Sequence, residues 1–163
     1  MKHPRDSVLT GFARHDHQQC VSAALTEAEN YCRHNKLRFT RVRKRSLGIL
    51  LENHCAMGAY DLLHRLEQEG LGSKPPVAYR ALGFLLDHGF VHRIEKLNAF
   101  VACAYPGASH QPAFLICSDC GAVAEANIGE TNSWLTLAAR QNGFQITHCI
   151  LEADGQCQKC QQA

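Results

Sequence analysis

The 163-residue sequence contains no run of apolar residues close to the roughly 18 that a membrane-spanning helix requires. Its first 17 residues also lack the continuous apolar core of a secretory signal peptide. Internal repeats and low-complexity segments are absent as well. These absences predict a soluble, cytoplasmic protein with no membrane partner. In that reducing compartment the nine cysteines are expected to be metal ligands or buried thiols rather than disulfides.

Acidic residues are missing from one stretch of the chain. Between Arg33 and Arg45 there are seven basic residues and no acidic one. Residues 1–105 contain 15 Lys and Arg against 10 Asp and Glu, whereas residues 106–163 contain 2 against 5. This asymmetry indicates that the first half meets a polyanion, although an unevenly charged solvated surface would give the same pattern.

Apolar residues at helical spacing predict four helices in the first half. They run from Val21 to a cap at Asn35, from a cap at Thr40 through Leu51, between Gly58 and Gly70, and from Pro75 to Gly89. Two short extended runs, 90–95 and 99–103, then predict a hairpin. Helices followed by a hairpin are typical of a winged helix-turn-helix, whose last helix enters the major groove.

The second half predicts a small α/β unit. Residues 105–109 indicate a hinge, 113–117 and 122–126 are candidate strands, and 131–142 is a candidate helix. We expect Trp134, Leu135 and Ala138 to face inward from that helix, and the alternating Phe144, Ile146, His148 and Ile150 to form a strand. The expected division is a winged-helix domain at 1–104 with a flexible leader at 1–17, a hinge at 105–112, and a dimerisation domain at 113–163. A unit this small has little apolar area, which favours a metal staple or a dimer partner.

Two C-x-x-C pairs, Cys117 with Cys120 and Cys157 with Cys160, are the most specific signal. Four thiolates suit tetrahedral structural zinc, and Gly121 permits a tight turn after the first pair. A redox pair, an iron–sulfur cluster and unrelated buried thiols are the alternatives.

His92, Cys103, His110 and Glu125 form a second candidate group around the hairpin and the hinge. Two nitrogens, one sulfur and one carboxylate oxygen make a tetrahedron that suits zinc, and the sulfur favours zinc over iron or manganese. Each residue alone could equally be an ordinary surface or core side chain. A metal bound by hairpin, hinge and second half would fix their relative orientation.

The basic stretch, together with Tyr79 and Arg80 in the fourth helix, is a candidate DNA surface. Lys and Arg neutralise phosphates, and Arg can hydrogen bond to guanine O6 and N7. The alternative is a solvated helix end beside a half-buried tyrosine.

At these residues the chain resembles the Fur family of metal-responsive transcriptional regulators, and most of all its zinc uptake regulator branch. The resemblance extends over roughly residues 23–160. It is carried by A-Y-D-L-L at 59–63, K-P-P-V-A-Y-R-A-L at 74–82, L-L-D-H-G-F-V-H at 85–92, F-L-I-C-S-D-C-G-A-V at 114–123 and the closing C-x-x-C.

The resemblance implies a homodimeric repressor of zinc uptake genes that binds an A·T-rich, nearly palindromic operator, with zinc as co-repressor. It implies two zinc ions per chain: a structural one on Cys117, Cys120, Cys157 and Cys160, and a regulatory one on His92, Cys103, His110 and Glu125. It also assigns DNA contacts to Arg80, Tyr60, Tyr79 and Arg38.

The sequence departs from the family pattern at three places. Val77 and Ala78 replace Thr and Val before Tyr79, and Arg41 stands where the family has a helix-starting proline. Of the family's His-rich hinge cluster only His110 remains, which favours zinc over iron. A regulator that responds to iron or peroxide is the alternative. An enzyme is not expected, because four protein ligands at each site leave no open position for catalysis.

Overall fold

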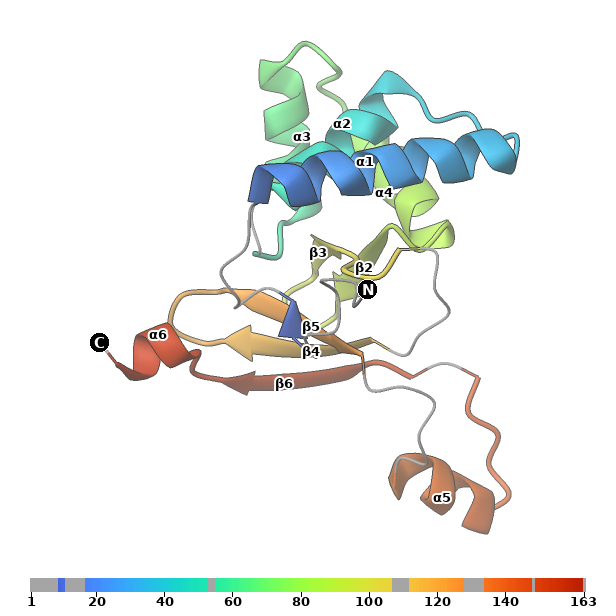
Figure 1. Cartoon of the computed structure of the whole chain (residues 1–163), viewed down its shortest axis with the longest axis vertical. Helices are drawn as coiled ribbons and strands as arrows, with labels where there is room; N and C mark the ends of the chain where they lie inside the picture. The colour runs from blue at the N-terminus through green and yellow to red at the C-terminus, as the bar shows by residue number, and fades with distance from the viewer. Residues whose placement is uncertain are drawn as a thin grey trace.

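The computed structural model of the chain describes residues 9–10, 17–52, 55–106, 112–127, 134–147 and 149–162. Its N-terminal part contains the helices α1 (His17–His34), α2 (Arg41–Leu51), α3 (Ala59–Gln68) and α4 (Pro75–Asp87), followed by the hairpin β2 (Val91–Ile94) and β3 (Ala99–Ala102). The four helices and the hairpin expected from the sequence are therefore present, in a mixed helix and sheet structure (Figure 1).

Local signals explain where two of these helices begin and end. Thr40 has an extended backbone, and its hydroxyl accepts a hydrogen bond from the Arg43 N–H at 3.3 Å, which caps α2. Two prolines start α4, where the missing N–H groups have no helical partner in any case. Gly89 then ends α4 with a φ of +69°, a left-handed conformation that glycine adopts at little cost.

The four helices bury one apolar core. Its most enclosed members come from all four helices: Ala28, Cys32, Ile49, Leu50, Leu62, Leu66, Leu82 and Leu85. Val91 and Phe100 of the hairpin join the same core. The hairpin is therefore packed against the helices rather than projecting from them.

The C-terminal part is built on a four-stranded sheet in the order β1-β5-β4-β6. Its strands are β1 (Leu9–Thr10), β4 (Pro112–Cys117), β5 (Val123–Asn127) and β6 (Leu151–Gly155). The strands β1 and β4 are antiparallel to β5, whereas β6 is parallel to β4. The parallel register pairs Cys117 with Gly155, which brings the C-terminal segment 156–162 beside the end of β4.

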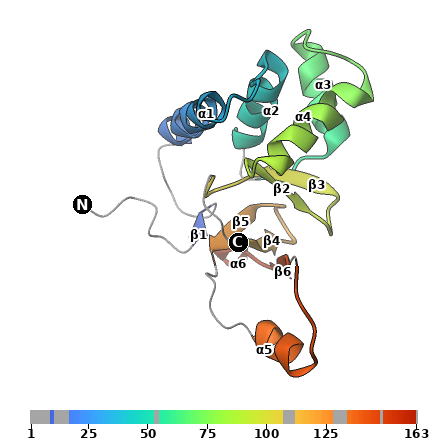
Figure 2. The same cartoon turned by 90° about the vertical axis from the view of Figure 1, so that its right-hand side faces the viewer.

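A second apolar cluster joins the hairpin to the sheet. Ile94 and Val101 of the hairpin pack with Phe114, Ile116 and Val123 of β4 and β5. Figure 2 shows the hairpin lying between the helices and the sheet. The hairpin thus has one face in each core, and moving it away from the sheet would expose the second core to water.

The expectation of a strand through Phe144, Ile146, His148 and Ile150 is wrong for the described residues. The last strand begins at Leu151, because that is where the backbone reaches β4 and can pair with it. Phe144 and Ile146 instead line a hollow of about 410 Å³ together with Leu135, Ala138 and Ala139. His148 lies outside the described residues.

The inward orientation expected for Trp134 is also wrong within the single chain. The helix α5 (Trp134–Gln141) lies apart from the rest of the molecule (Figure 1), and none of its residues is buried. Trp134 is 75% exposed, and Leu137 is 58% exposed. Leu135 and Ala138 are half-buried against the following segment with Phe144 and Ile146, whereas Trp134 and Leu137 are not covered by any other described part of the chain.

Candidate metal centres and nucleic-acid interface

The two C-x-x-C pairs come together at one end of the sheet. Cys117 ends β4, Cys120 lies in the following turn, Cys157 precedes the short helix α6 (Gln158–Gln161), and Cys160 lies within it. Their four sulfur atoms all lie within 4.8 Å of one another. The parallel pairing of β4 with β6 is what joins pairs that are far apart in the sequence.

The spacing of these sulfurs fits zinc. Cys120 Sγ and Cys157 Sγ are 3.8 Å apart. Four thiolates in a tetrahedron at about 2.3 Å from a zinc ion would lie about 3.8 Å from one another. Gly121 has a φ of +70°, so the chain turns sharply directly after Cys120, as expected from the sequence. The four residues could hold one structural zinc ion.

Backbone amides at this site favour the thiolate form of Cys117. The N–H groups of Cys120 and Cys157 lower the pKa of the Cys117 thiol to about 6, and the Cys157 N–H lies 3.3 Å from Cys117 Sγ. The thiolate is the form that binds metal. Backbone amides of the turn and of the start of α6 therefore favour the metal-binding thiolate form of Cys117 near neutral pH.

The second group lies where the hairpin meets the sheet. His92 is on β2, Cys103 directly follows β3, and Glu125 is on β5. One ligand atom from each residue lies within 4.8 Å of the others, and both Cys103 and Glu125 are buried. His110, the fourth residue expected in this group, lies outside the described residues.

The distances in this group also suit a tetrahedral metal. His92 Nε2 lies 3.2 Å from Glu125 Oε1, and Cys103 Sγ lies 3.9 Å from the same oxygen. Ligands of a tetrahedral zinc ion at about 2.0–2.3 Å would be separated by roughly 3.3–3.8 Å. The second carboxylate oxygen of Glu125 accepts a hydrogen bond from the Ala104 N–H at 2.8 Å, which orients the carboxylate.

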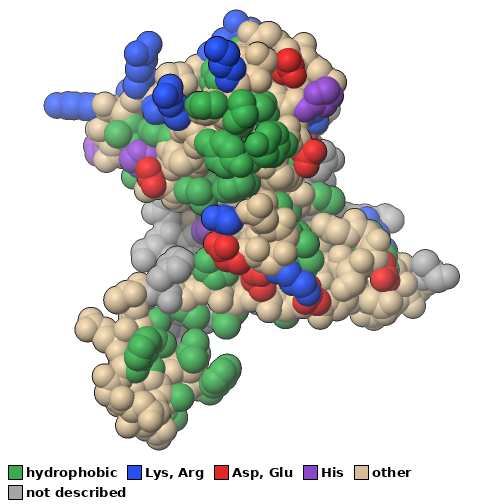
Figure 3. All heavy atoms as spheres, turned by 180° about the vertical axis from the view of Figure 1, so that it is seen from behind, with side chains coloured by type: hydrophobic (Ala, Val, Ile, Leu, Met, Phe, Trp, Pro, Cys, Tyr) green, Lys and Arg blue, Asp and Glu red, His purple; other side chains and the backbone are tan. Residues whose placement is uncertain are grey.

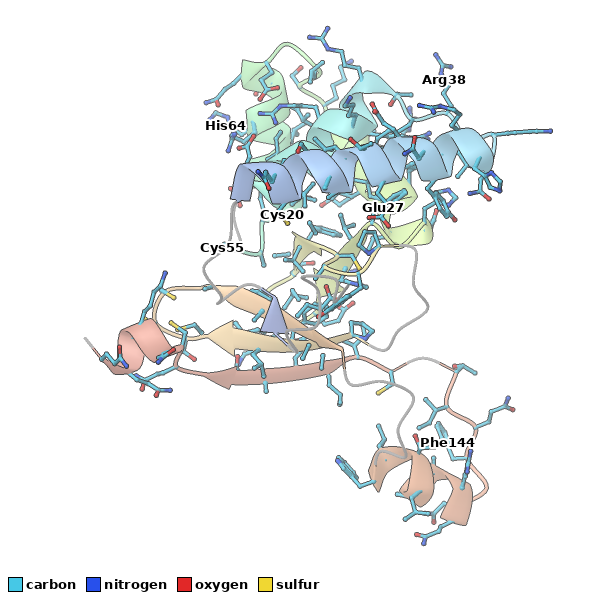
Figure 4. All side chains as sticks on the ribbon, viewed as in Figure 1. Cys20, Glu27, Arg38, Cys55, His64 and Phe144 are labelled. Carbon is cyan, nitrogen blue, oxygen red and sulfur yellow. The ribbon has the colours of Figure 1, made fainter. Side chains whose placement is uncertain are left out.

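Burial and two nearby carboxylates oppose ionisation of the Cys103 thiol. Burial raises the pKa of the Cys103 thiol far above its usual range, and the charges of Glu125 and Glu27 raise it further. Glu27 is on α1, and Figure 4 shows its side chain on the side of the helix that faces the hairpin and sheet. A charge from α1 at this site could not be predicted from the sequence, because nothing in the pattern of α1 distinguishes Glu27 from a solvated acid.

The residues expected to contact DNA lie on the helical part of the molecule. Tyr60 begins α3 and Tyr79 lies in α4, and their rings meet edge to face at a centroid distance of 6.5 Å. Both rings are more than half exposed, and Arg80 beside Tyr79 is exposed too. Arg38, just before α2, projects from the far end of the helices (Figure 4). Lys and Arg side chains gather over the same helical part (Figure 3).

Part of the basic stretch has structural partners. Lys44 pairs with Glu29, and Arg45 binds Glu52 at 2.7 Å and Glu69 at 2.6 Å. Arg43 lies over the ring of Phe84 at 3.8 Å. Three of the seven basic residues thus already have partners that tie the helices together, a role that sequence alone could not separate from phosphate binding.

The remaining cysteines that are described fall outside both clusters. Cys32 is buried in the helical core, Cys149 is half-buried near α5, and Cys20 and Cys55 are exposed (Figure 4). Among the described residues, no helix is both long and apolar enough to cross a membrane.

The sequence profile of the ferric uptake regulator family matches residues 34–154 of the chain. The chain belongs to this family. It is 40% identical over 138 residues to the zinc uptake regulation protein of Escherichia coli, with 83% of this chain and 80% of that protein aligned.

Solved structures of family members share this architecture. A zinc uptake regulator in complex with zinc and DNA matches with a TM-score of 0.81 at 36% identity, over 87% of this chain and 95% of that one. The holo form of XcZur matches with a TM-score of 0.77 at 37% identity, over 86% and 99% of the two chains. The apo form of XcZur reaches a TM-score of only 0.50 at 36% identity, over 88% and 99%. The arrangement of this chain therefore resembles the holo form more than the apo form.

Proposed function

We propose that the protein is a zinc-responsive transcriptional repressor of zinc uptake genes that binds DNA as a homodimer, with zinc as its co-repressor. The observation that carries the proposal is the group His92, Cys103 and Glu125, whose ligand atoms join the hairpin to the sheet. The hairpin packs on α4 and its neighbours, so a metal bound there would bias the orientation of the DNA-binding helices.

Zinc would act as a cross-link in the proposed regulatory site and would need no open coordination position. His92, Cys103, Glu125 and His110 are the proposed ligands. Their mixture of nitrogen, sulfur and oxygen favours zinc. A site made of nitrogen and oxygen ligands alone would suit iron equally well, but the Cys103 thiolate shifts the preference towards zinc. The likeness to the holo form of a zinc uptake regulator supports the same conclusion.

The four cysteines are proposed to hold a second, structural zinc ion. Cys157 and Cys160 lie in the C-terminal segment, and Cys117 and Cys120 lie at the end of β4. A metal there would fasten that segment to the sheet, in a part of the chain that has a small apolar core. The proposed roles of the two sites are thus distinct. The four-cysteine site stabilises the C-terminal part, and the regulatory site makes DNA binding depend on the zinc concentration.

Base and phosphate contacts are proposed for the exposed residues of the helical part. Arg80 and Tyr79 lie on α4 and Tyr60 on α3, while Arg38 is suited to the DNA backbone or the minor groove. An α4 helix in the major groove would present Arg80 to a guanine. The kind of operator proposed is an A·T-rich near-palindrome, because a two-fold symmetric dimer reads two related half-sites.

A second copy of the chain is proposed to cover the C-terminal part. Trp134 and Leu137 of α5 and the nearby Phe144 are exposed, and β6 forms one edge of the sheet. Exposed apolar groups of this size and an open strand edge are each typical of an interface. A homodimer would bury them and would set the spacing between two recognition helices.

The proposal is tested by selecting duplexes from a random-sequence pool with protein in excess zinc and with protein treated with a mild chelator. We expect selective retention of an A·T-rich near-palindrome with zinc only. Equal, salt-sensitive and unselective retention in both states would contradict the zinc response. Repeating the selection with iron(II) or manganese(II) in place of zinc separates this proposal from a regulator that responds to iron or peroxide.

A further inference from the structure

The turn of the hairpin is bound to the last strand of the sheet. Glu152 on β6 accepts a hydrogen bond from the Glu95 N–H at 2.7 Å and another from the Lys96 N–H at 3.1 Å, one with each carboxylate oxygen. The Lys96 ammonium group also pairs with Asp154. Glu152 and Asp154 are two residues apart on β6, so their side chains leave the same face of the strand.

The backbone of the hairpin turn presents two neighbouring N–H groups that bind a carboxylate. Asn98 has a φ of +46°, and its N–H donates to the Glu95 carbonyl oxygen at 3.1 Å, which closes the turn inward. The N–H groups of Glu95 and Lys96 therefore point outward side by side, as in backbone nests that bind anions. Hydrogen bonds from two amides to one charged acceptor are stronger than those between neutral groups.

This contact lies at the opposite end of the hairpin from the proposed regulatory zinc site. His92 is paired with Val101 near the open end of the hairpin, and Cys103 follows two residues later. Glu95 and Lys96 lie in the turn at the other end. In addition to the apolar cluster between them, the hairpin and the sheet are thus joined by polar groups at two separated points, Glu152 on β6 and the cluster that includes Glu125 on β5.

A second point of attachment restricts rotation of the hairpin relative to the sheet. A hairpin held only at the metal cluster could pivot about it, whereas a hairpin also held at its turn keeps His92 and Cys103 directly over Glu125. The strands that carry the two acids are joined through β4, so their separation is fixed by backbone pairing. The Glu152 contact needs no metal and is available before zinc binds.

We propose that Glu152 is a positioning residue for the zinc response, which anchors the hairpin turn to β6 and so pre-organises the regulatory ligands. The inference rests on the proposed function. When only a fraction of molecules has the ligands assembled, the apparent affinity for the metal falls by that fraction. Glu152 raises the assembled fraction and lowers the zinc concentration at which the protein binds DNA.

Other links between hairpin and sheet limit the size of the effect. Met57 exchanges two backbone hydrogen bonds of 2.8 Å with Phe100, and the nearby Cys55 forms a bridge with Ala122. The apolar cluster around Phe114 adds to them. Loss of the Glu152 contact alone should therefore weaken zinc binding about three- to tenfold rather than abolish it.

The test compares full-length Glu152→Gln with Glu95→Gln as a matched control. Both substitutions remove one negative charge near the turn, but within the described part of the chain the Glu95 side chain pairs with the neighbouring Arg93, and its backbone N–H is kept. Zinc affinity is measured by competition with a chromophoric chelator on dimer that retains its structural zinc. Amide hydrogen exchange at Glu95 and Lys96 reports the contact itself.

We expect Glu152→Gln to speed exchange at both amides and to weaken regulatory zinc binding about three- to tenfold, with DNA binding at saturating zinc within about twofold of wild type. Glu95→Gln should match wild type. Faster exchange with unchanged zinc affinity would overturn the positioning role, and so would unchanged exchange. If Glu152→Gln does not fold, Asp154→Asn should shift zinc affinity in the same direction by a smaller factor, and an unchanged affinity would overturn the proposal. A wild-type protein whose DNA binding ignores zinc would instead contradict the proposed function.

Discussion

His92 Nε2 lies 3.2 Å from Glu125 Oε1, and this contact joins the hairpin that follows α4 to the central strand β5 of the sheet. The two residues are separated by the whole hinge region in the sequence. Their carboxylate and imidazole are both largely enclosed, so an ionic or metal-mediated link between them is shielded from solvent. Small changes at this junction are expected to alter the orientation of the helices.

Replacing Cys103 by serine removes the only sulfur of the His92, Cys103 and Glu125 group. We expect Cys103→Ser to remain a folded dimer but to lose zinc-dependent DNA binding by at least about 100-fold, because the group loses one of its proposed ligands. Fluorescence anisotropy of a labelled operator across a zinc titration measures the loss. The exposed Cys20 supplies the control Cys20→Ser, which should behave as wild type. A normal zinc response in Cys103→Ser would remove this group as the sensor.

Removal of metal from the four-cysteine group should destabilise the C-terminal part. Cys117→Ser is expected to reduce bound zinc from two ions per chain to one and to lower the melting temperature by more than about 10 °C, since structural zinc contributes on the order of 10 kcal/mol at neutral pH. Elemental analysis and calorimetry provide the two measurements. Cys149→Ser is the control, because Cys149 lies outside the cluster. Retention of both zinc ions in Cys117→Ser would exclude this ligand set.

Arg80 tests base reading by α4. Its substitution by alanine should weaken operator binding by about 1–3 kcal/mol, mainly through one base-pair position in each half-site. A panel of operators with single substitutions shows where the discrimination is lost. Arg140→Ala on α5 removes the same charge far from the helical part and should leave binding unchanged. A loss that is equal for all sequences would make Arg80 a phosphate contact.

The ion pairs between α2 and α3 predict a pH-dependent contribution to stability. Partial burial opposes ionisation of Glu52, but hydrogen bonds from Arg65 and Arg45 at 2.6 and 2.7 Å outweigh it and lower the pKa of its carboxyl group. Because the pKa is lower in the folded than in the unfolded state, the stabilisation is present above the unfolded value of about 4.3 and is lost as pH falls through the folded value.

We therefore expect Glu52→Gln to reduce the free energy of unfolding by about 1 kcal/mol at pH 7, a value kept small because the side chain is one-third exposed. The difference from wild type should shrink below about pH 4. Urea unfolding at several pH values measures it. Glu67→Gln, at an exposed position of α3, should show no such pH-dependent difference. A difference that persists unchanged at low pH would point to packing rather than charge.

Much of the N-terminal part could be predicted from the sequence, because its signals are local. Helix spacing, the Thr40 cap and the glycine after α4 act within a few residues of each other, and the structure contains all of them. The two cysteine pairs were also recognisable by spacing, and their sulfurs do meet.

The features that escaped prediction depend on contacts between distant segments. The strand β6 exists because β4 is beside it, and its composition alone, with Glu152, Asp154 and a glycine, does not favour a strand. Likewise, Glu152 accepts a hydrogen bond from Lys96 in the hairpin turn, 56 residues earlier in the sequence, and no local pattern predicts such a contact. Trp134 is exposed because α5 lies apart from the rest of the described residues, a placement that helical spacing alone does not predict.

The short strand β1 has a consequence for assembly. Its residues pair with Ala126 and Glu125, and the bridge from Cys55 to Ala122 covers the other end of the same β5 edge. A dimer joined along β6 would be closed by its two-fold axis, and the sheet edges that the described strands leave at its two ends would be these covered β5 edges.

Removal of β1 would uncover strand edges at both ends of such a dimer, each able to add another copy. Strand pairing between dimers would then not be limited by symmetry, and linear polymers rather than discrete dimers would form. In such a dimer the two residues of β1 would limit assembly to a pair of chains.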